Sequence, residues 1–225
     1  MNRKTLLFTL INAFIFVSTI IVTYLTLNYG TVAGQVDTGT SVGWFYIVTF
    51  TVESNILLGA IAGVATACGL KSLIDKSDLP RSLTIWYLVA ASSAMLTCLT
   101  VLLFLAPMRA ASGKNYFEML MGPMFFFHFF NPILAAITLI FLSGNTKLTI
   151  KARLLSLIPP ILYSIPYILN VTVFKSWPDF YGITFGGQYA FIPLVFAVFC
   201  LVVFGISTIL AILHNRTVVK SKNPW

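Results

Sequence analysis

The stretch TLLFTLINAFIFVSTIIVTYLTLN, residues 5–28, contains no Lys, Arg, Asp or Glu. A helix of this length covers roughly 36 Å, which exceeds the roughly 30 Å of hydrocarbon in a bilayer. Arg3 and Lys4 precede this apolar run, as the positively charged region of a secretory signal peptide precedes its apolar core. The apolar run is longer than such signals have, however, and no convincing small-residue cleavage site follows it. We therefore expect a retained first transmembrane helix.

Five further apolar runs of comparable length follow, and Glu53 is the one charged residue within them. Backbone groups in lipid must pair within their own segment, so runs of this length are helices. The runs lack the alternating pattern of a membrane β-barrel strand. The expected fold is an all-α integral membrane protein, a six-transmembrane-helix bundle that forms one domain over residues 1–225. The expected helices are residues 5–28, 44–70, 83–107, 119–142, 154–174 and 189–213.

The distribution of Lys and Arg predicts the orientation of this bundle. The chain is 58% hydrophobic and 9% charged, with 14 Lys and Arg residues. Arg109, Lys114 and Lys175 fall in connections on one side of the predicted topology. The other eleven fall on the opposite side, in the two termini and in the second and fourth connections. The positive-inside rule then predicts a cell-membrane protein with both termini in the cytoplasm.

The net charge of +8 is interpreted as this topogenic signal, with a contact to anionic lipids as a second role. No basic cluster interleaved with aromatic residues indicates nucleic-acid binding. Cys68, Cys98 and Cys200 lie in three different apolar runs without metal-ligand spacing, and we interpret them as packing residues. We therefore expect no metal and no cofactor, and membrane lipids are the expected partners.

Two ionisable residues lie inside the apolar runs, and such residues are costly in hydrocarbon unless they serve a purpose. Glu53 lies in FTVESN, residues 50–55, and His128 begins HFFNPIL, residues 128–134. Both predicted helices run inward from the outer side. Thr51 and His128 then lie at similar depth, about 10–13 Å below the outer boundary at 1.5 Å per residue. Their side chains are the candidate reactive pair.

Helical spacing places Thr51 and Asn55 on one face, which Gly59 and Gly63 continue as a surface for close packing. Asn131 shares a face with His128 in the same way. Glu53 is turned about 200° away from Thr51, so we expect it off this face and paired with a polar or cationic group, for which Arg109 is the candidate. Simpler roles exist for each: a Thr hydroxyl usually bonds its own helix, and Asn side chains join helices.

Three stretches in the same order resemble the androgen-induced six-helix membrane hydrolase family, especially its bacterial-type relatives. They are residues 50–55, the His128-x-x-x-Pro132-Ile133-Leu134 sequence, and Trp177-Pro178-Asp179-Phe180 before the last run. The resemblance implies an intramembrane hydrolase of fatty-acyl esters, with Thr51 as nucleophile and His128 as its base. Asn55 or Asn131 would orient the imidazole or stabilise an oxyanion. Glu53 departs from the neutral residue expected at its position.

Three interpretations remain open from the sequence. The first is the lipid-ester hydrolase that uses Thr51 and His128. The second is a small proton-coupled transporter in which Glu53 and His128 titrate, although no internal repeat supports it. The third is a non-catalytic membrane protein whose polar residues hold the helices together.

Overall fold

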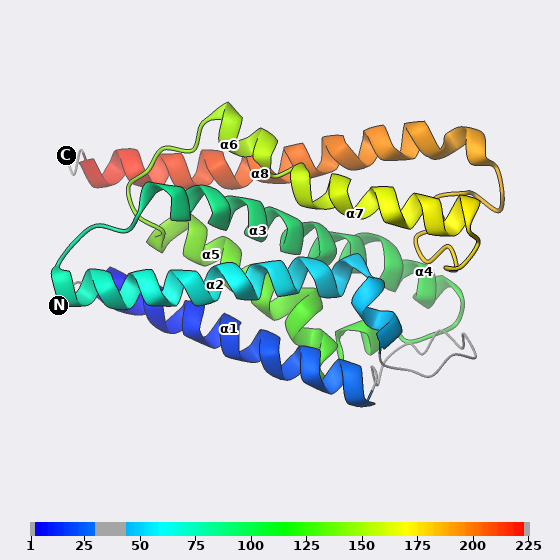
Figure 1. Ribbon diagram of the computed structural model, residues 1–225, viewed down its shortest axis with the longest axis horizontal. Helices are drawn as coiled ribbons and strands as arrows, with labels where there is room; N and C mark the ends of the chain where they lie inside the picture. The colour runs from blue at the N-terminus through cyan, green and yellow to red at the C-terminus, as the bar shows by residue number, and fades with distance from the viewer. Residues whose placement is uncertain (1–2, 30–43, 223–225) are drawn as a thin grey trace.

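The computed structural model describes residues 3–29 and 44–222, and in these residues the protein is an all-α bundle with six helical spans (Figure 1). Several spans combine an α-helix with short 3-10 or π-helical segments. In chain order the elements are α1 (Arg3–Tyr29), η1 (Trp44–Val48), α2 (Phe50–Asp75), α3 (Arg81–Thr100), η2 (Val101–Leu105), α4 (Ala106–Ala111), η3 (Tyr116–Leu120), η4 (Phe126–Phe130), α5 (Asn131–Leu142), α6 (Ile150–Leu155), α7 (Ile158–Ile168), η5 (Leu169–Val173), η6 (Tyr189–Phe191) and α8 (Ile192–Lys222).

Five of the spans are long and apolar enough to cross a membrane, and the fourth is a shorter apolar helix over Phe126–Leu142. The six-helix class expected from the sequence is confirmed. The spans run alternately up and down, so that the start of α1 and the end of α8 lie at the same end of the bundle (Figure 1). We call this the proximal end. The opposite end, where α2 begins and α8 begins, is the distal end.

The third span is the centre of the bundle. Helix α3 packs against α2, α5, α6, α7 and α8. Its middle consists of the small residues Ala90, Ala91, Ser92, Ser93 and Ala94, all completely buried. Small side chains let neighbouring helix backbones approach closely, which is how helices associate where no water drives them together.

The glycines of α2 likewise allow the first span to approach closely. A Cβ at Gly59 would lie 2.6 Å from Cγ2 of Thr19, and one at Gly63 would lie 3.0 Å from the Phe16 ring. Helices α1 and α2 therefore touch along the glycine face predicted from residues 51–63.

Two helices begin later than expected. The fourth begins at Phe126, not at residue 119, because Gly122 takes a left-handed φ of 58° and Pro123 follows it. In the second span, the α-helix begins at Phe50 after the 3-10 segment Trp44–Val48. Thr51 and Glu53 consequently lie in the first turn of α2.

Candidate functional site

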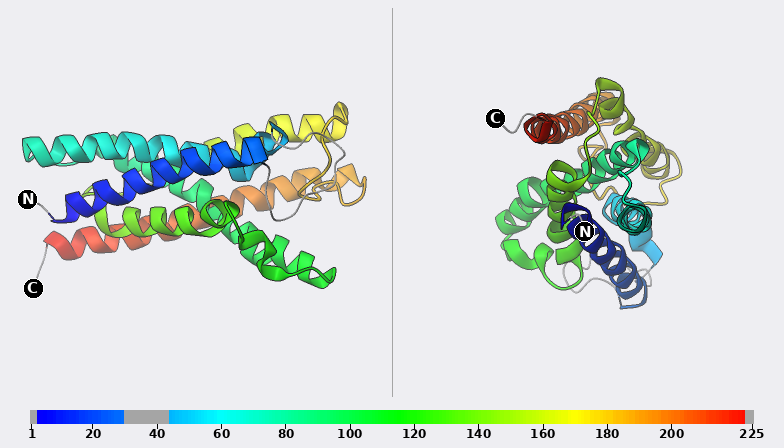
Figure 2. Two further views of the ribbon diagram at one scale, coloured as in Figure 1. Left: turned by 90° about the horizontal axis from the view of Figure 1, so that it is seen from below. Right: turned by 90° about the vertical axis from the view of Figure 1, so that its left-hand side faces the viewer.

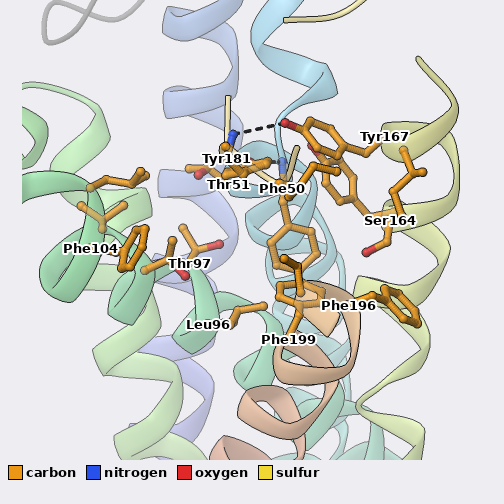
Figure 3. Close-up of a pocket in the computed structure, with 18 of the residues that line it drawn as sticks. Phe50, Thr51, Leu96, Thr97, Phe104, Ser164, Tyr167, Tyr181, Phe196 and Phe199 are labelled. Carbon is orange, nitrogen blue, oxygen red and sulfur yellow. Dashed lines mark hydrogen bonds between the residues drawn. The ribbon is translucent and has the colours of Figure 1, made fainter. Parts of the chain in front are cut away.

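A cavity of about 470 Å³ lies in the distal half of the bundle, between α2, α3, η2, α4, α7 and α8 (Figure 3). This volume lies within the usual range for small-molecule and cofactor sites. The wall is mostly aliphatic and aromatic, and the described lining residues include no Lys, Arg, Asp, Glu or His. Along the third span the lining runs from Leu96 to Met108, a rise of roughly 18 Å at 1.5 Å per residue. The site is shaped for a long uncharged apolar group.

The cavity opens sideways, toward the surface that would face lipid. Phe104 and Met108 line it, yet 60% and 59% of their surface is exposed. In Figure 2 the segment that contains α4 and η4 diverges from α7 and α8 at the distal end. The distal end itself is covered by residues 181–183 and Phe185, which also line the cavity. An apolar ligand would therefore enter from the membrane rather than from water.

Three tyrosines form the wall beside α7. The Tyr163 hydroxyl donates to the Val48 carbonyl at 2.9 Å. The Tyr181 hydroxyl accepts from the Phe50 amide, the first residue of α2, at 3.0 Å (Figure 3). The Tyr167 hydroxyl accepts from the Tyr181 amide at 3.1 Å. These bonds fix the covering segment to the start of α2 and to α7.

Asp179 holds the covering segment in shape. Its carboxylate accepts from the Tyr167 hydroxyl at 3.0 Å, from the Ile183 amide at 2.9 Å and from the Thr184 amide and hydroxyl at 2.8 Å. Burial raises the pKa of this carboxyl, but the hydrogen bonds from Thr184, Ile183 and Tyr167 outweigh burial and lower the pKa below its ordinary value. The segment that covers the distal end of the cavity is therefore held in place by an ionised Asp179.

Thr51 lines the cavity, and its hydroxyl has no hydrogen-bond partner among the described residues. The hydroxyls of Thr9, Thr66 and Thr172 bond the carbonyl four residues earlier. Such bonding is the usual state of Thr in a membrane helix. Some other threonine hydroxyls also lack a partner but are buried away from the cavity: Thr19, Thr23, Thr26, Thr138 and Thr208. Thr51 thus offers a free hydroxyl to the cavity.

His128 is 94% buried in η4 and does not appear among the described residues that line the cavity. Its Nδ1 lies 2.6 Å from the Met119 carbonyl. Because a carbonyl can only accept, Nδ1 carries the proton in a neutral ring and Nε2 keeps its lone pair. This is the tautomer that a general base needs. A contact between Nε2 and the Thr51 hydroxyl remains a prediction.

Asn55 joins the turn of Thr51 to the turn of His128. Its Nδ2 donates to the Thr51 carbonyl at 2.8 Å and to the Phe127 carbonyl at 3.1 Å. The second bond has a cause in the sequence. In η4 the amide of Asn131 bonds the carbonyl five residues back, at Phe126. The next amide in that pattern would bond Phe127, but it belongs to Pro132, which has no N–H. The Asn55 side chain supplies the missing donor.

The same arrangement occurs once more in the third span. In η2 the Ala106 amide bonds the Val101 carbonyl, and Pro107 follows it. Pro107 leaves the Leu102 carbonyl without its next donor, and the Tyr116 hydroxyl donates to that carbonyl at 2.7 Å. In both places a proline after a π-turn frees a carbonyl, and a side chain from elsewhere in the chain binds it. Such turns are frequent at functional sites.

The remaining candidates lie apart from the cavity. Asn131 is completely buried, and its Oδ1 accepts from the Ser18 hydroxyl at 3.1 Å, which ties α5 to α1. Glu53 lies off the cavity lining, as expected. The expected pairing of Glu53 with Arg109 is wrong, because Arg109 forms its ion pair with Glu118 at 3.1 Å. Glu53 is exposed on the protein surface at the start of α2.

The tyrosine wall and the role of Asp179 were not foreseen as parts of a site. The sequence signal was present, because Trp177-Pro178-Asp179-Phe180 had been singled out as an aromatic motif. Its contacts with Tyr167, and those of Tyr181 with α2, depend on how the chain turns back after the fifth span.

A comparison of the chain with protein families, curated proteins and solved structures finds no match.

Proposed function

We propose that the protein is a multi-pass enzyme that binds the hydrocarbon chain of a membrane lipid in the cavity and cleaves its acyl ester at Thr51. The observation that carries the proposal is the free Thr51 hydroxyl in an apolar cavity that opens toward lipid. The resemblance to the androgen-induced membrane hydrolases supports the same assignment. We further propose the cell membrane as its location, with the proximal end in the cytoplasm.

In the proposed reaction, the Thr51 Oγ1 attacks the carbonyl carbon of the ester, and its proton passes to Nε2 of His128. The C–O bond to the alcohol breaks, and the imidazolium returns the proton to the leaving alkoxide. A water molecule then attacks the acyl-threonine, with His128 again accepting and returning the proton. The products are a free fatty acid and an alcohol, and Thr51 is regenerated.

The positions of the polar groups favour this proposal over a proton-coupled transporter. A relay would need its titrating groups along one path through the bundle, but Glu53 does not line the cavity. Glu53 lies on the surface, where a shuttle through the bundle cannot use it.

The experiment is an ester-cleavage assay on purified protein in lipid nanodiscs, with a series of octanoyl, dodecanoyl and palmitoyl esters. Thr51→Ala and His128→Gln should each abolish cleavage, Thr51→Ser should retain part of it, and Glu53→Gln should leave most of it. Thr66→Ala is the matched control, because that threonine lies on the same helix with its hydroxyl bonded to the Ala62 carbonyl. Cleavage that survives in Thr51→Ala would refute the proposal, whereas a proton flux lost in Glu53→Gln would support the transporter.

A further inference from the structure

The cavity offers a ligand few free polar groups. Its described lining has no charged side chain, and its polar side chains are all hydroxyls. Most of these hydroxyls are already hydrogen-bonded within the protein: Thr97 with Ser54 at 2.9 Å, Ser164 with the Pro160 carbonyl at 2.7 Å, and Tyr163, Tyr167 and Tyr181 with backbone groups. In the described lining, the hydroxyls of Thr51 and Thr100 make no hydrogen bond.

Thr51 and Thr100 lie at the same depth in the bundle. The hydroxyl oxygens of Ser54 on α2 and Thr97 on α3 are 2.9 Å apart, which fixes the register of these two antiparallel helices. Thr51 precedes Ser54 by three residues, and Thr100 follows Thr97 by three. Each therefore lies about 4.5 Å nearer the distal end than that contact, at 1.5 Å per residue. Because both also line the cavity, one ligand group at this depth can contact both hydroxyls.

The charged groups at the distal end are occupied or lie away from the cavity. Arg109 is paired with Glu118 at 3.1 Å. The Asp179 carboxylate already accepts four hydrogen bonds. The remaining charged side chains described at this end do not line the cavity: Glu53, Lys114 and Lys175. An ionic group in the cavity would therefore meet no opposite charge, and burying an unpaired charge is costly.

The boundaries of the cavity are apolar as well. The opening at Phe104 and Met108 leads toward lipid, and Ile183 and Phe185 belong to the segment that covers the distal end. A ligand that reaches either boundary therefore meets hydrocarbon. Both ends of the ligand, and not only its middle, should be uncharged.

We propose that the substrate is an ester whose acid and alcohol parts are both uncharged hydrocarbon, with its ester group held between Thr51 and Thr100. This substrate class rests on the ester-cleavage function proposed above, and it adds a second catalytic residue. The Thr100 hydroxyl donates to the carbonyl oxygen of the ester. When Thr51 attacks the carbonyl carbon, that oxygen becomes an oxyanion and the hydrogen bond from Thr100 strengthens. No covalent bond to Thr100 forms or breaks.

The substrate class is tested with octyl decanoate and two analogues of equal length, whose alcohol part ends in a carboxylate or in an ammonium group. The full chain is reconstituted in nanodiscs of ether phospholipids, which contain no ester, and each substrate concentration is corrected for partition into the bilayer. The kcat/KM for octyl decanoate should exceed that for either charged ester by at least about tenfold, since an unpaired charge is costlier to bury than a neutral group. A smaller ratio for either charged ester would overturn the substrate class.

The role of Thr100 is tested with variants of its side chain. Thr100→Val removes the hydroxyl at nearly constant volume, so it should lower kcat for octyl decanoate about 100-fold and change KM less than about tenfold. Thr100→Ala serves in its place if that variant does not fold. Thr100→Ser keeps the donor and should retain most of the activity, a rescue that a packing role would not give.

Ser93→Ala is the matched control, because it also removes a hydroxyl from α3, one that is bonded to the Val89 carbonyl. Its kcat should equal that of the parent. An unchanged kcat in Thr100→Val, or an equal loss in Ser93→Ala, would overturn the catalytic role of Thr100.

Binding to the Thr51→Ala protein separates failure of the substrate class from failure of the proposed function. The probe is the tritiated ketone in which CH₂ replaces the ester oxygen of octyl decanoate, so it cannot be cleaved. Octyl decanoate should displace this ketone at a concentration at least about tenfold lower than either charged ester. If the parent cleaves no ester but this order holds, the proposed function and the catalytic role of Thr100 fail, whereas the ligand class stands. If the parent cleaves all three esters equally, the function stands and the substrate class fails. Displacement in any other order also overturns the substrate class.

Discussion

The pairing of Asn55 with the carbonyl freed by Pro132 predicts an energetic coupling between two residues on different helices. Asn55→Ala removes the donor to the Phe127 carbonyl, which then lies buried without a partner. An unsatisfied buried carbonyl costs about 1–3 kcal/mol. The Asn55 Oδ1, which is itself buried without a partner, disappears in the same substitution and offsets part of this cost. We expect Asn55→Ala to lower the free energy of unfolding by about 1–2 kcal/mol, within this range.

Pro132→Ala should rescue that loss. It restores an N–H at the position whose amide continues the π-turn, so the Phe127 carbonyl regains a donor from its own helix. In the Pro132→Ala background, Asn55→Ala should therefore cost at least about 1 kcal/mol less than in the parent protein. The four proteins of this double-mutant cycle would be unfolded by SDS titration in mixed micelles, with circular dichroism as the signal.

Asn12 provides a matched control. Its Nδ2 also donates to the carbonyl four residues earlier, at Phe8 and at 2.8 Å, and its Oδ1 is also buried without a partner. Its Nδ2 donates within α1 and to no described residue of the fourth span, so Asn12→Ala and Pro132→Ala should be additive within about 0.5 kcal/mol. Additivity of Asn55→Ala with Pro132→Ala within the same margin would refute the explanation given for the two motifs.

Three further predictions concern the helix contacts and the cover of the cavity. Gly59→Val should lower the free energy of unfolding by about 1–3 kcal/mol in the same titration, because its Cβ would lie 2.6 Å from Cγ2 of Thr19; an unchanged value would contradict the close α1–α2 contact. Tyr181→Phe should cost about 1 kcal/mol, measured likewise, because the Phe50 amide loses its acceptor. Asp179 has a lowered pKa, so its stabilisation is present above the ordinary carboxyl pKa and is lost as the pH falls through the lowered value. Asp179→Asn should therefore flatten the acid side of a plot of unfolding temperature against pH, and an unchanged acid side would show that the carboxylate does not hold the cover.

The six spans were predictable because hydrocarbon imposes one simple requirement, a long run of uncharged residues. The close contact along Gly59 and Gly63 was also predictable, since residues four apart share a helix face. The start of the fourth span was missed although Gly122-Pro123 signals a break in a helix. The expected helix over residues 119–142 was drawn from the length of the apolar run alone, so it included that dipeptide.

The site was predicted only in part, because a helix pattern gives depth and face but not the partners across the bundle. Thr51 was assigned to a polar face, yet the cavity beside it arises from residues of three other spans and of the connection before the last span, which no local pattern connects. The Asn55–Phe127 bond could have been inferred from Pro132, since a proline always removes one helix donor. The expected Glu53–Arg109 pair does not form, because the Arg109 guanidinium donates to the carboxylate of Glu118, nine residues further along the chain.

The most direct test of the central claim is covalent labelling of the intact protein with a long-chain alkyl fluorophosphonate, followed by mass spectrometry of the modified peptide. The phosphonyl group reacts with an activated hydroxyl, and the alkyl chain should occupy the apolar cavity. We predict one modified residue, Thr51, with labelling that is lost in Thr51→Ala and His128→Gln, retained in Thr66→Ala and slowed by excess fatty-acyl ester. Labelling at another residue, or no labelling of a folded protein, would contradict the assignment of Thr51 as the nucleophile of a lipid-ester hydrolase.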